Sequence, residues 1–215
     1  MYAPAHFREE RLAVLHEAIG QARLATLVTL GGGGLEASHI PVLLEADEGE
    51  NGTLYGHLAR GNPQWKTASS SVPALMIFMG PDAYISPSWY AEKAKNGKVV
   101  PTWNYVTVHA TGDLEFFEEK DRLLSLVTRL TEKHESQRAQ PWAVSDAPAD
   151  YIDAHLKGIV GFRLPIARLE GKWKMSQNRN REDRQGVVTG LGEASGPLEE
   201  AVAEIMAREI MARGL

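Results

Sequence analysis

The feature that most constrains the fold is a series of β-rich segments that follow one another through short connections. These segments are residues 23–30, 35–45, 53–59, 72–80, 83–89 and 102–117, and only one short helix, beginning near residue 63, is expected among them. Parallel neighbours need crossover connections of about a dozen residues or more, so short connections favour antiparallel pairing. The lack of a regular strand–helix alternation argues against a doubly wound nucleotide-binding fold. We therefore expect an α+β protein whose antiparallel sheet closes into a β-barrel with flanking helices.

The remaining segments are expected to be mostly helical and to surround the barrel. Helices are predicted over 7–22, 118–135, 149–157, 181–191 and 197–215, and 158–175 is the last expected strand, with a bend at Pro165. Four consecutive glycines, 31–34, lie between two strands with no helix after them, which favours a hairpin turn over a phosphate loop. The sequence predicts one domain over 1–192 and a C-terminal helical segment, 193–215, that packs on it.

Composition excludes several classes of function. The chain has no cysteine, which excludes disulfides, thiolate catalysis and iron–sulfur clusters. Its formal net charge of −5 gives it no overall attraction to nucleic acid or to anionic lipid. The longest apolar run, Val72–Met79, is too short to span a bilayer, and the first residues lack an apolar signal core. A cytoplasmic protein is expected.

A dense group of polar side chains marks the joint between the third strand and the short helix. The stretch "YGHLARGNPQW", residues 55–65, contains His57, Arg60, Asn62, Gln64 and Trp65. Asn62 is suited to cap the helix, with Pro63 at its first position. Taken alone, the stretch is most simply interpreted as an ordinary capped helix start. The alternative is a seat for a phosphorylated ligand, because a helix start offers N–H groups and Arg60 offers a planar cation.

Three further clusters have groups that could serve a ligand. The stretch 84–90 ends a strand with Ser86, Ser88, Trp89 and Tyr90, which suits either a turn or a ligand. The stretch 100–112 contains Thr102, Trp103, Asn104, Tyr105 and His109, and core packing is the favoured interpretation of its aromatic residues. The stretch 171–184 is locally basic, with Lys172, Lys174, Arg179, Arg181 and Arg184. It could be a solvated helix start capped by Asn180, or an anion site for phosphate or nucleic acid.

Hydrolase and metal sites find little support in the sequence. Neither a G-x-S-x-G nucleophile elbow nor an H-E-x-x-H zinc helix occurs. His39, His57 and His109 could meet on facing strands, but each is better interpreted as a hydrogen-bonded or ligand-contact residue. No metal site is expected.

Taken in order, the clusters form a recognisable set. The stretches "MYAPAHF", "SHIPVLLE", "GHLARGNPQW", "YISPSWY", "VPTWNYVTVHATG" and "KWKMSQNRNREDRQGVVTGL" resemble the PaiB family of FMN-binding negative transcriptional regulators. The resemblance extends from residue 1 to about residue 192. It implies a split β-barrel, normally a homodimer with two FMN sites at the subunit interface. One departure from the family pattern is Gly61, which stands where alanine is more familiar.

The resemblance also implies a set of cofactor-binding residues. The phosphate would lie against Arg60, Asn62 and Trp65, with His57 nearby, and the flavin ring would lie beside His39 and Ile40. The wall of the site, in part from the partner subunit, and its closing residues would be Ser86, Trp89, Tyr90, Thr102, Asn104, Lys174, Ser176 and Gln177. No catalytic residue is identified.

The function that the resemblance implies is transcriptional repression by an FMN-binding dimer. Direct DNA contact would use 172–184, although a regulator that responds to flavin and acts indirectly fits the negative net charge better. The alternative is a flavin-dependent oxidoreductase of the pyridoxamine-phosphate-oxidase-like or haem-degrading kind, since bound flavin itself performs redox chemistry. A flavin-binding protein with neither activity is a third hypothesis.

Overall fold

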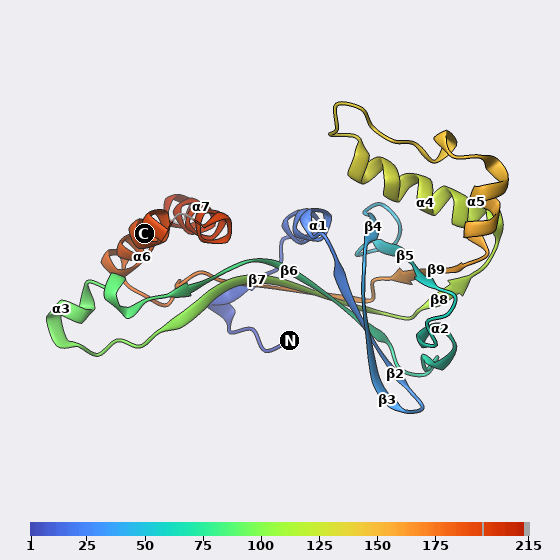
Figure 1. The fold of residues 1–215 in the computed structure, drawn as a ribbon. Helices are drawn as coiled ribbons and strands as arrows, with labels where there is room; N and C mark the ends of the chain where they lie inside the picture. The colour runs from blue at the N-terminus through green and yellow to red at the C-terminus, as the bar shows by residue number, and fades with distance from the viewer. Residues whose placement is uncertain (195, 213–215) are drawn as a thin grey trace. The chain divides into compact units, whose positions relative to one another are not determined.

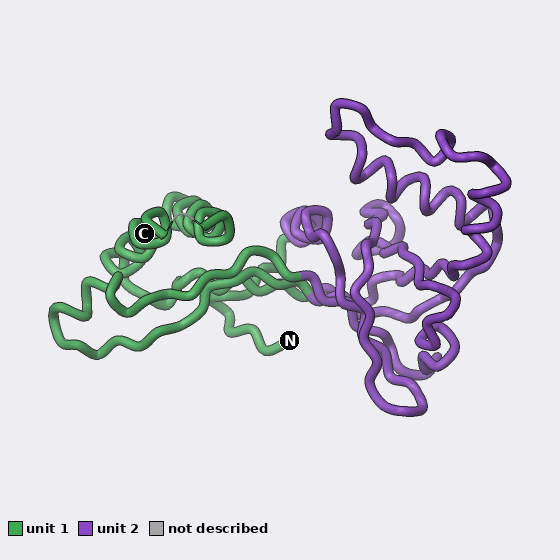
Figure 2. Tube along the Cα trace, viewed as in Figure 1, with its two compact units in different colours: residues 1–11, 79–108, 170–215 green, residues 12–78, 109–169 purple. Residues whose placement is uncertain are grey.

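The computed structural model describes residues 1–194 and 196–212, and its contacts divide the chain into two units. Unit 1 consists of residues 1–11, 79–108 and 170–215, and unit 2 consists of residues 12–78 and 109–169 (Figure 2). Three strands, β6 (Ala74–Ile85), β7 (Thr102–Gly112) and β10 (Arg168–Lys174), have residues in both units.

Unit 1 is a sheet with helices on one face. Its strands are neighbours in the order β1, β10, β7, β6, with Arg8 opposite Lys172 where β1 (Arg8–Glu9) meets β10. The other elements are η1 (Ala5–Phe7), η2 (Pro87–Trp89), α3 (Glu92–Asn96), α6 (Arg181–Ala194) and α7 (Pro197–Ala212). Helices α6 and α7 lie on one side of the strands, and the N-terminal segment lies on the other (Figure 1). Buried Ile85, Val106, Leu191 and Val202 fill the helix-covered side.

Unit 2 contains two groups of antiparallel strands. In one, β6, β2 (Ala25–Gly31) and β3 (Gly34–Ile40) are neighbours in that order. The other is a four-stranded sheet in the order β4 (Val42–Glu45), β5 (Thr53–Ala59), β9 (Ile159–Pro165), β8 (Glu115–Phe117). The helical elements are α1 (Leu12–Gln21), α2 (Gln64–Thr67), α4 (Lys120–Glu135), η3 (Val144–Asp146) and α5 (Ala149–Leu156). Buried leucines of α4 and α5 pack with Leu43 and Phe117 of the four-stranded sheet.

Many of the expected elements are confirmed. The glycine run makes the β2–β3 hairpin, the chain bends between β9 and β10 just after Pro165, and helices occupy most of 118–135, 149–157 and 181–191. The strand expected over 35–45 is instead two strands in different sheets, separated at Pro41, which has no N–H for a ladder bond. The strands expected at 72–80 and 83–89 are largely one strand, β6, that continues through Pro81.

Two further expectations about elements were wrong in detail. The first helix begins at Leu12 rather than residue 7, because Arg8 and Glu9 pair with β10. The segment 102–117 is two strands, β7 and β8, that belong to different sheets. None of the described helices is both long and apolar enough to cross a membrane. The proposed boundary near residue 192 stays a prediction, and α6 ends at Ala194.

Candidate functional site

The residues that the resemblance implies for the cofactor divide between the two units. Unit 2 contains His39, Ile40, His57, Arg60, Asn62 and Trp65. Unit 1 contains Ser86, Trp89, Tyr90, Thr102, Asn104, Lys174, Ser176 and Gln177. Each group can therefore be assessed by its own contacts.

Arg60 uses its guanidinium for contacts inside unit 2. Nε donates to the carbonyl oxygen of Lys157 at 2.7 Å, Nη2 donates to that of Ile159 at 3.1 Å, and Nη1 pairs with Glu118. The Trp65 indole N–H donates to the carbonyl oxygen of Arg60 at 3.0 Å. The side chain thus ties the joint after β5 to the start of β9. A phosphate contact through Arg60 stays a prediction, and it would have to compete with these bonds.

Asn62, Ser38 and Gln64 form a closed ring of hydrogen bonds at the start of α2. The Gln64 N–H donates to Asn62 Oδ1 at 3.0 Å, Asn62 Nδ2 donates to Ser38 Oγ at 2.9 Å, and Ser38 Oγ donates to Gln64 Oε1 at 2.6 Å. The buried Gln64 amide also donates to Thr29 Oγ1 at 3.0 Å. Asn62 thus accepts the first N–H of α2, as a cap would, although α2 begins at Gln64 and Pro63 is the residue directly before it. Because α2 is a single turn, few peptide dipoles add at its start, and it offers little of the expected anion affinity.

The two histidines of this group lie in different surroundings. His57 shares its face of β5 with Tyr55, which packs on the cluster formed by α4, α5 and Ile159. Burial lowers the pKa of the His57 imidazole, whose Nδ1 has no hydrogen-bond partner among the described residues. His39 is exposed on β3, with Nδ1 3.0 Å from Thr26 Oγ1. Ile40 next to it is buried.

In unit 1, three of the predicted residues are part of the core beneath α6 and α7. Asn104 and Ser176 are buried and exchange two hydrogen bonds of 3.1 Å, and Asn104 also donates to the sulfur of Met206 at 3.2 Å. Ser176 has a φ of 59°, a left-handed conformation that is uncommon for residues other than glycine. Tyr90 is buried, and Arg179 lies 4.5 Å from its ring centroid. Burial raises the pKa of the Tyr90 hydroxyl, against the opposing charge of Arg179.

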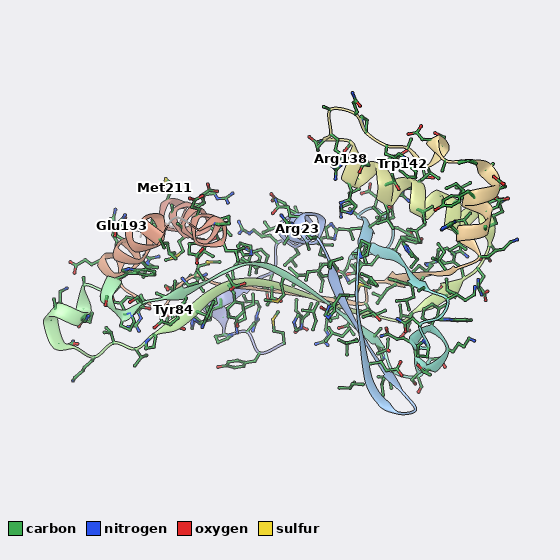
Figure 3. All side chains as sticks on the ribbon, viewed as in Figure 1. Arg23, Tyr84, Arg138, Trp142, Glu193 and Met211 are labelled. Atoms are coloured by element: carbon green, nitrogen blue, oxygen red, sulfur yellow. The ribbon has the colours of Figure 1, made fainter. Side chains whose placement is uncertain are left out.

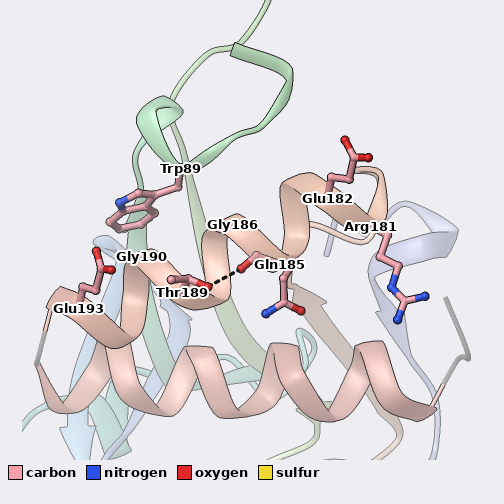
Figure 4. Close-up of a pocket in the computed structure, with 8 residues that line it drawn as sticks. All are labelled: Trp89, Arg181, Glu182, Gln185, Gly186, Thr189, Gly190 and Glu193. Carbon is pink, nitrogen blue, oxygen red and sulfur yellow. Dashed lines mark hydrogen bonds between the residues drawn. The ribbon is translucent and has the colours of Figure 1, made fainter. Parts of the chain in front are cut away.

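Trp89 belongs to η2, which packs on α6, and Ser86 is the residue just before η2. Ser86 Oγ caps η2 by accepting the Ser88 N–H at 3.2 Å. A Cβ at Gly190 would lie 2.4 Å from the Trp89 indole, and one at Gly186 would lie 2.1 Å from the Trp89 carbonyl oxygen. The two glycines therefore allow the close packing. Beside this contact, an open groove of about 610 Å³ runs along α6 (Figure 4); it is lined by Trp89, Arg181, Glu182, Gln185, Gly186, Thr189, Gly190 and Glu193.

The basic stretch 172–184 is not a continuous exposed strip. Gln177 accepts the Met175 N–H and donates to the Trp173 carbonyl oxygen, both at 2.7 Å, so its amide shapes the turn after β10. Asn180 Oδ1 accepts the Asp183 N–H at 2.8 Å, which confirms the expected cap. The basic side chains differ in exposure: Lys172 and Arg184 are buried, Lys174 and Arg179 are half-buried, and Arg181 is exposed.

The side of the unit 1 sheet opposite α6 and α7 combines cations with aromatic rings. We call it the open face, although the N-terminal segment lies along it and contacts Lys172 through Tyr2, and its members are Arg8, Tyr84, Trp103, Tyr105, Lys172 and Lys174. Tyr84 and Trp103 are 47% and 54% exposed, and their rings meet edge to face with centroids 5.9 Å apart. Tyr84 lies between Ala83 and Ile85, which pack under α6 and α7, so its side chain is on the opposite side of the strand (Tyr84 is labelled in Figure 3). The Lys172 ammonium lies 5.2 Å from the Tyr105 ring centroid.

Neither lysine of the open face has a carboxylate partner within the described part of the chain. Lys172 Nζ donates to the Tyr2 carbonyl oxygen at 3.1 Å. Lys174 Nζ donates to Thr102 Oγ1 at 2.6 Å and to the Trp103 carbonyl oxygen. Burial, followed by repulsion from Lys172 and from Arg179, lowers the pKa of Lys174. A half-buried cation that is repelled by its neighbours is suited to receive an anion.

Sequence reasoning identified Lys174 and Thr102 but did not assign Tyr84, Trp103, Tyr105 or Lys172 to the cofactor. The signal was present, because Trp103 and Tyr105 alternate with Asn104 and Val106, and alternate residues of a strand face opposite sides. The aromatic residues were interpreted as core. Groups of three or more metal-ligating side chains do not occur within the described residues. The open face brings two cations beside exposed aromatic rings.

Comparisons with known proteins agree on family and fold. Residues 1–168 match the family described as "Putative FMN-binding domain". The chain is 34% identical over 206 residues to protease synthase and sporulation protein PAI 2 of Bacillus subtilis, covering 96% of each chain. A flavocytochrome, Anf3 of Azotobacter vinelandii, is similar in structure with a TM-score of 0.57 at 14% identity, covering 83% of this chain and 75% of that one.

A second solved structure supports the same fold. The crystal structure of a putative 5-nitroimidazole antibiotic resistance protein of Bacteroides thetaiotaomicron has a TM-score of 0.56 at 13% identity, covering 77% of this chain and 85% of that one. At these identities the likeness concerns the fold alone. With its antiparallel sheets and flanking helices, the chain has the α+β split-barrel fold that was expected.

Proposed function

Because this chain belongs to the PaiB-type family of FMN-binding domains, we propose that it binds FMN on the open face of unit 1. The observation on which the placement rests is the pair Lys172 and Lys174, whose ammonium groups have only uncharged acceptors beside exposed aromatic rings. FMN offers the two complementary groups, a phosphate for the cations and a planar ring for the aromatic side chains.

The residues of the open face fit the cofactor by their chemistry. Lys174 and Lys172 would hold the phosphate, and the Thr102 hydroxyl, which keeps Lys174 in place at 2.6 Å, would orient the donor. Trp103 and Tyr84 would stack against the ring system and shield it from water. When bound, FMN supplies one- and two-electron redox chemistry.

The first test compares two single variants. We expect Lys174→Met to weaken FMN binding by about 10- to 150-fold, which corresponds to the roughly 1.5–3 kcal/mol of a charge-assisted hydrogen bond. Arg60→Ala should reduce stability but change FMN affinity far less, because its donors are engaged inside unit 2. Affinity is measured by titrating the flavin-free protein and following flavin fluorescence.

Lys98→Met is the matched control, because Lys98 is an exposed lysine of the same unit that lies outside the open face. If Arg60→Ala weakens FMN binding more than Lys174→Met does, the phosphate binds in unit 2 and the placement on the open face is wrong. Equal binding by all three variants would contradict both placements.

We further propose that any regulatory role of the protein is indirect rather than by DNA contact through 172–184. Four of the five basic side chains in that stretch are buried or half-buried, and only Arg181 is exposed among them. A strip that contacts DNA needs several exposed cations, because affinity grows with the number of phosphates neutralised.

The test is DNA binding as a function of salt for the native chain and Arg181→Ala. Under this proposal the variant leaves any DNA association and its salt dependence unchanged. A salt slope that falls by about one unit in Arg181→Ala would show that the stretch contacts phosphates, against the proposal.

A further inference from the structure

The first residues of the chain lie along the open face of unit 1, on the side of the sheet away from α6 and α7 (Figure 1). We call residues 1–3 the strap. The Met1 amino group pairs with both carboxylate oxygens of Glu170, at 3.0 and 3.1 Å, and the Met1 side chain is only 7% exposed. The ends of a chain are usually poorly ordered unless contacts hold them down. The strap is therefore held in a defined position on the sheet.

The strap covers the ammonium group of Lys172. Glu170 and Lys172 are two residues apart on β10, so their side chains are on the same side of this strand. Lys172 Nζ donates to the Tyr2 carbonyl oxygen at 3.1 Å, and the centroids of the Tyr2 and Tyr105 rings lie 5.6 and 5.2 Å from Nζ. Lys172 is in consequence only 9% exposed, although it belongs to the open face. An anion cannot reach Nζ freely while the strap is in place.

The strap can move without disturbing the strand that follows it. Phe7 is buried and β1 pairs with β10, so the base of the N-terminal segment is fixed. The single turn η1 separates this base from the strap, and Arg8 Nη2 donates to the Ala3 carbonyl oxygen at 3.4 Å, a long and therefore weak bond. The Tyr2 residue is 84% exposed, so its ring loses little packing when it moves. Residues 1–3 can therefore leave the sheet while β1 stays paired.

We propose that the strap is an autoinhibitory cover of the phosphate site. In the flavin-free chain it occupies Lys172, and a phosphate group contacts Lys172 only after the strap has moved away. The inference rests on the proposed binding of FMN to the open face. A ligand that binds only the uncovered form has its affinity reduced by the fraction of uncovered chains. The strap therefore weakens the binding of phosphate monoesters such as FMN, and loosening the pair of Met1 with Glu170 strengthens it.

Two variants loosen the strap by different routes. Glu170→Gln removes the charge that holds the Met1 amino group. Tyr2→Ala removes the exposed ring near the Lys172 ammonium and changes no charge. We expect each variant to bind FMN about 2- to 5-fold more tightly, the factor expected for the loss of one exposed ion pair or cation–π contact. Glu200→Gln is the matched control, because Glu200 is an exposed glutamate of α7, on the other side of the sheet. Fluorescence titration of the flavin-free chains measures the affinities.

The covering of Lys172 can be measured without flavin. Brief treatment with acetic anhydride acetylates accessible lysine side chains, and mass spectrometry compares the acetylation of Lys172 with that of exposed Lys98 in the same chain. We expect Lys172 to react slowly in the native chain and about 2- to 5-fold faster in Glu170→Gln and Tyr2→Ala, because acetylation, like phosphate binding, needs the uncovered ammonium group. Glu200→Gln should react like the native chain.

The two readouts separate this inference from the proposed function. Unchanged acetylation of Lys172 in both variants would show that the strap does not cover it, which overturns the inference. In a chain that binds FMN, unchanged affinity in Tyr2→Ala would also overturn it, because this variant loses no carboxylate that could by itself alter anion binding. If the chain binds no FMN but Lys172 reacts faster in both variants, the cover is supported and the proposed flavin site is wrong.

Discussion

At the scale of single residues, the open face depends on the alternation of side chains along two strands. Lys172 and Lys174 lie on one side of β10, while Trp173 and Met175 pack with α6 and α7 on the other. The sequence predicted Lys174 as a cofactor residue and recognised the basic stretch, but it could not show which cations would be buried. The burial of each cation depends on which side of β10 the helices cover, and the local sequence of 171–184 does not indicate that side.

The proposed stacking of Trp103 on the flavin ring can be tested by removing the indole. We expect Trp103→Ala to weaken FMN binding by about 2- to 13-fold, the equivalent of roughly 0.5–1.5 kcal/mol for an aromatic pair. Trp142→Ala is the matched control, because Trp142 is 48% exposed but belongs to unit 2 (Figure 3). Fluorescence titration measures both, and equal affinities would place the ring elsewhere.

The lowered pKa of Lys174 predicts the direction in which FMN affinity changes with pH. Its pKa is lowered by burial and by the neighbouring cations, so Lys174 loses its proton at a lower pH than an ordinary lysine does. A phosphate binds the protonated form better, and FMN affinity should therefore fall as pH rises through the lowered pKa. The dissociation constant is measured from pH 7 to pH 10. Lys174→Met should lack this part of the decline, and an identical decline in both proteins would contradict the assignment.

At the scale of elements, the sequence predicted most strands and helices but not how the strands divide between sheets. Pro41 and Pro81 illustrate the difficulty. Both interrupt β-rich segments, yet the chain changes sheets at Pro41 and β6 continues through Pro81. A proline is tolerated in a strand where its missing N–H is not needed for a ladder bond, and sequence does not show which positions need one.

The contact between η2 and α6 also depends on long-range packing. Gly190 lies in the middle of a helix, where sequence alone suggests a mild defect. The structure explains it by the Trp89 indole, 2.4 Å from the position of an added Cβ. Asn180 caps α6 by accepting an N–H three residues along the chain, so this cap could be predicted from local sequence. The contact of Trp89 with Gly190 joins residues far apart in the sequence, and it could not be predicted in this way.

Two glycines of α6 form a matched pair for testing this contact. Gly190→Ala should lower the free energy of unfolding by about 1–3 kcal/mol, because the methyl group meets the indole and forces η2 to shift. Gly192→Ala, in the same helix with nothing within 4 Å of an added Cβ, should be neutral or stabilising by up to about 1 kcal/mol. Urea denaturation compares them, and equal effects would show that Trp89 does not restrict α6.

At the scale of the whole molecule, the fold class followed from the order of elements, but the two units did not. The sequence suggested one domain over 1–192, while contacts group the chain's two ends with 79–108. In β7 the even-numbered residues from Asn104 to Gly112 are buried in both units, so the periodicity of this strand contains no sign of the boundary within it.

Hydrogen exchange can distinguish the two possible positions of FMN, because the open face and the joint near Arg60 belong to different units. We expect added FMN to slow amide exchange most in the unit 1 parts of β7 and β10, where Trp103 and Lys174 lie. Segment 53–67 of unit 2 should change less. The reverse pattern, with the largest protection at 53–67, would favour the phosphate seat near Arg60.

Flavin binding by the open face is tested most simply by a binding measurement with the flavin-free native chain. Equilibrium dialysis against FMN, with the flavin quantified by its visible absorption, gives both the stoichiometry and the affinity. If the open face binds FMN, binding saturates at one FMN per chain, and affinity falls strongly in Lys174→Met but not in Lys98→Met. A native chain that retains no FMN at a large excess would show that the open face is not a flavin site.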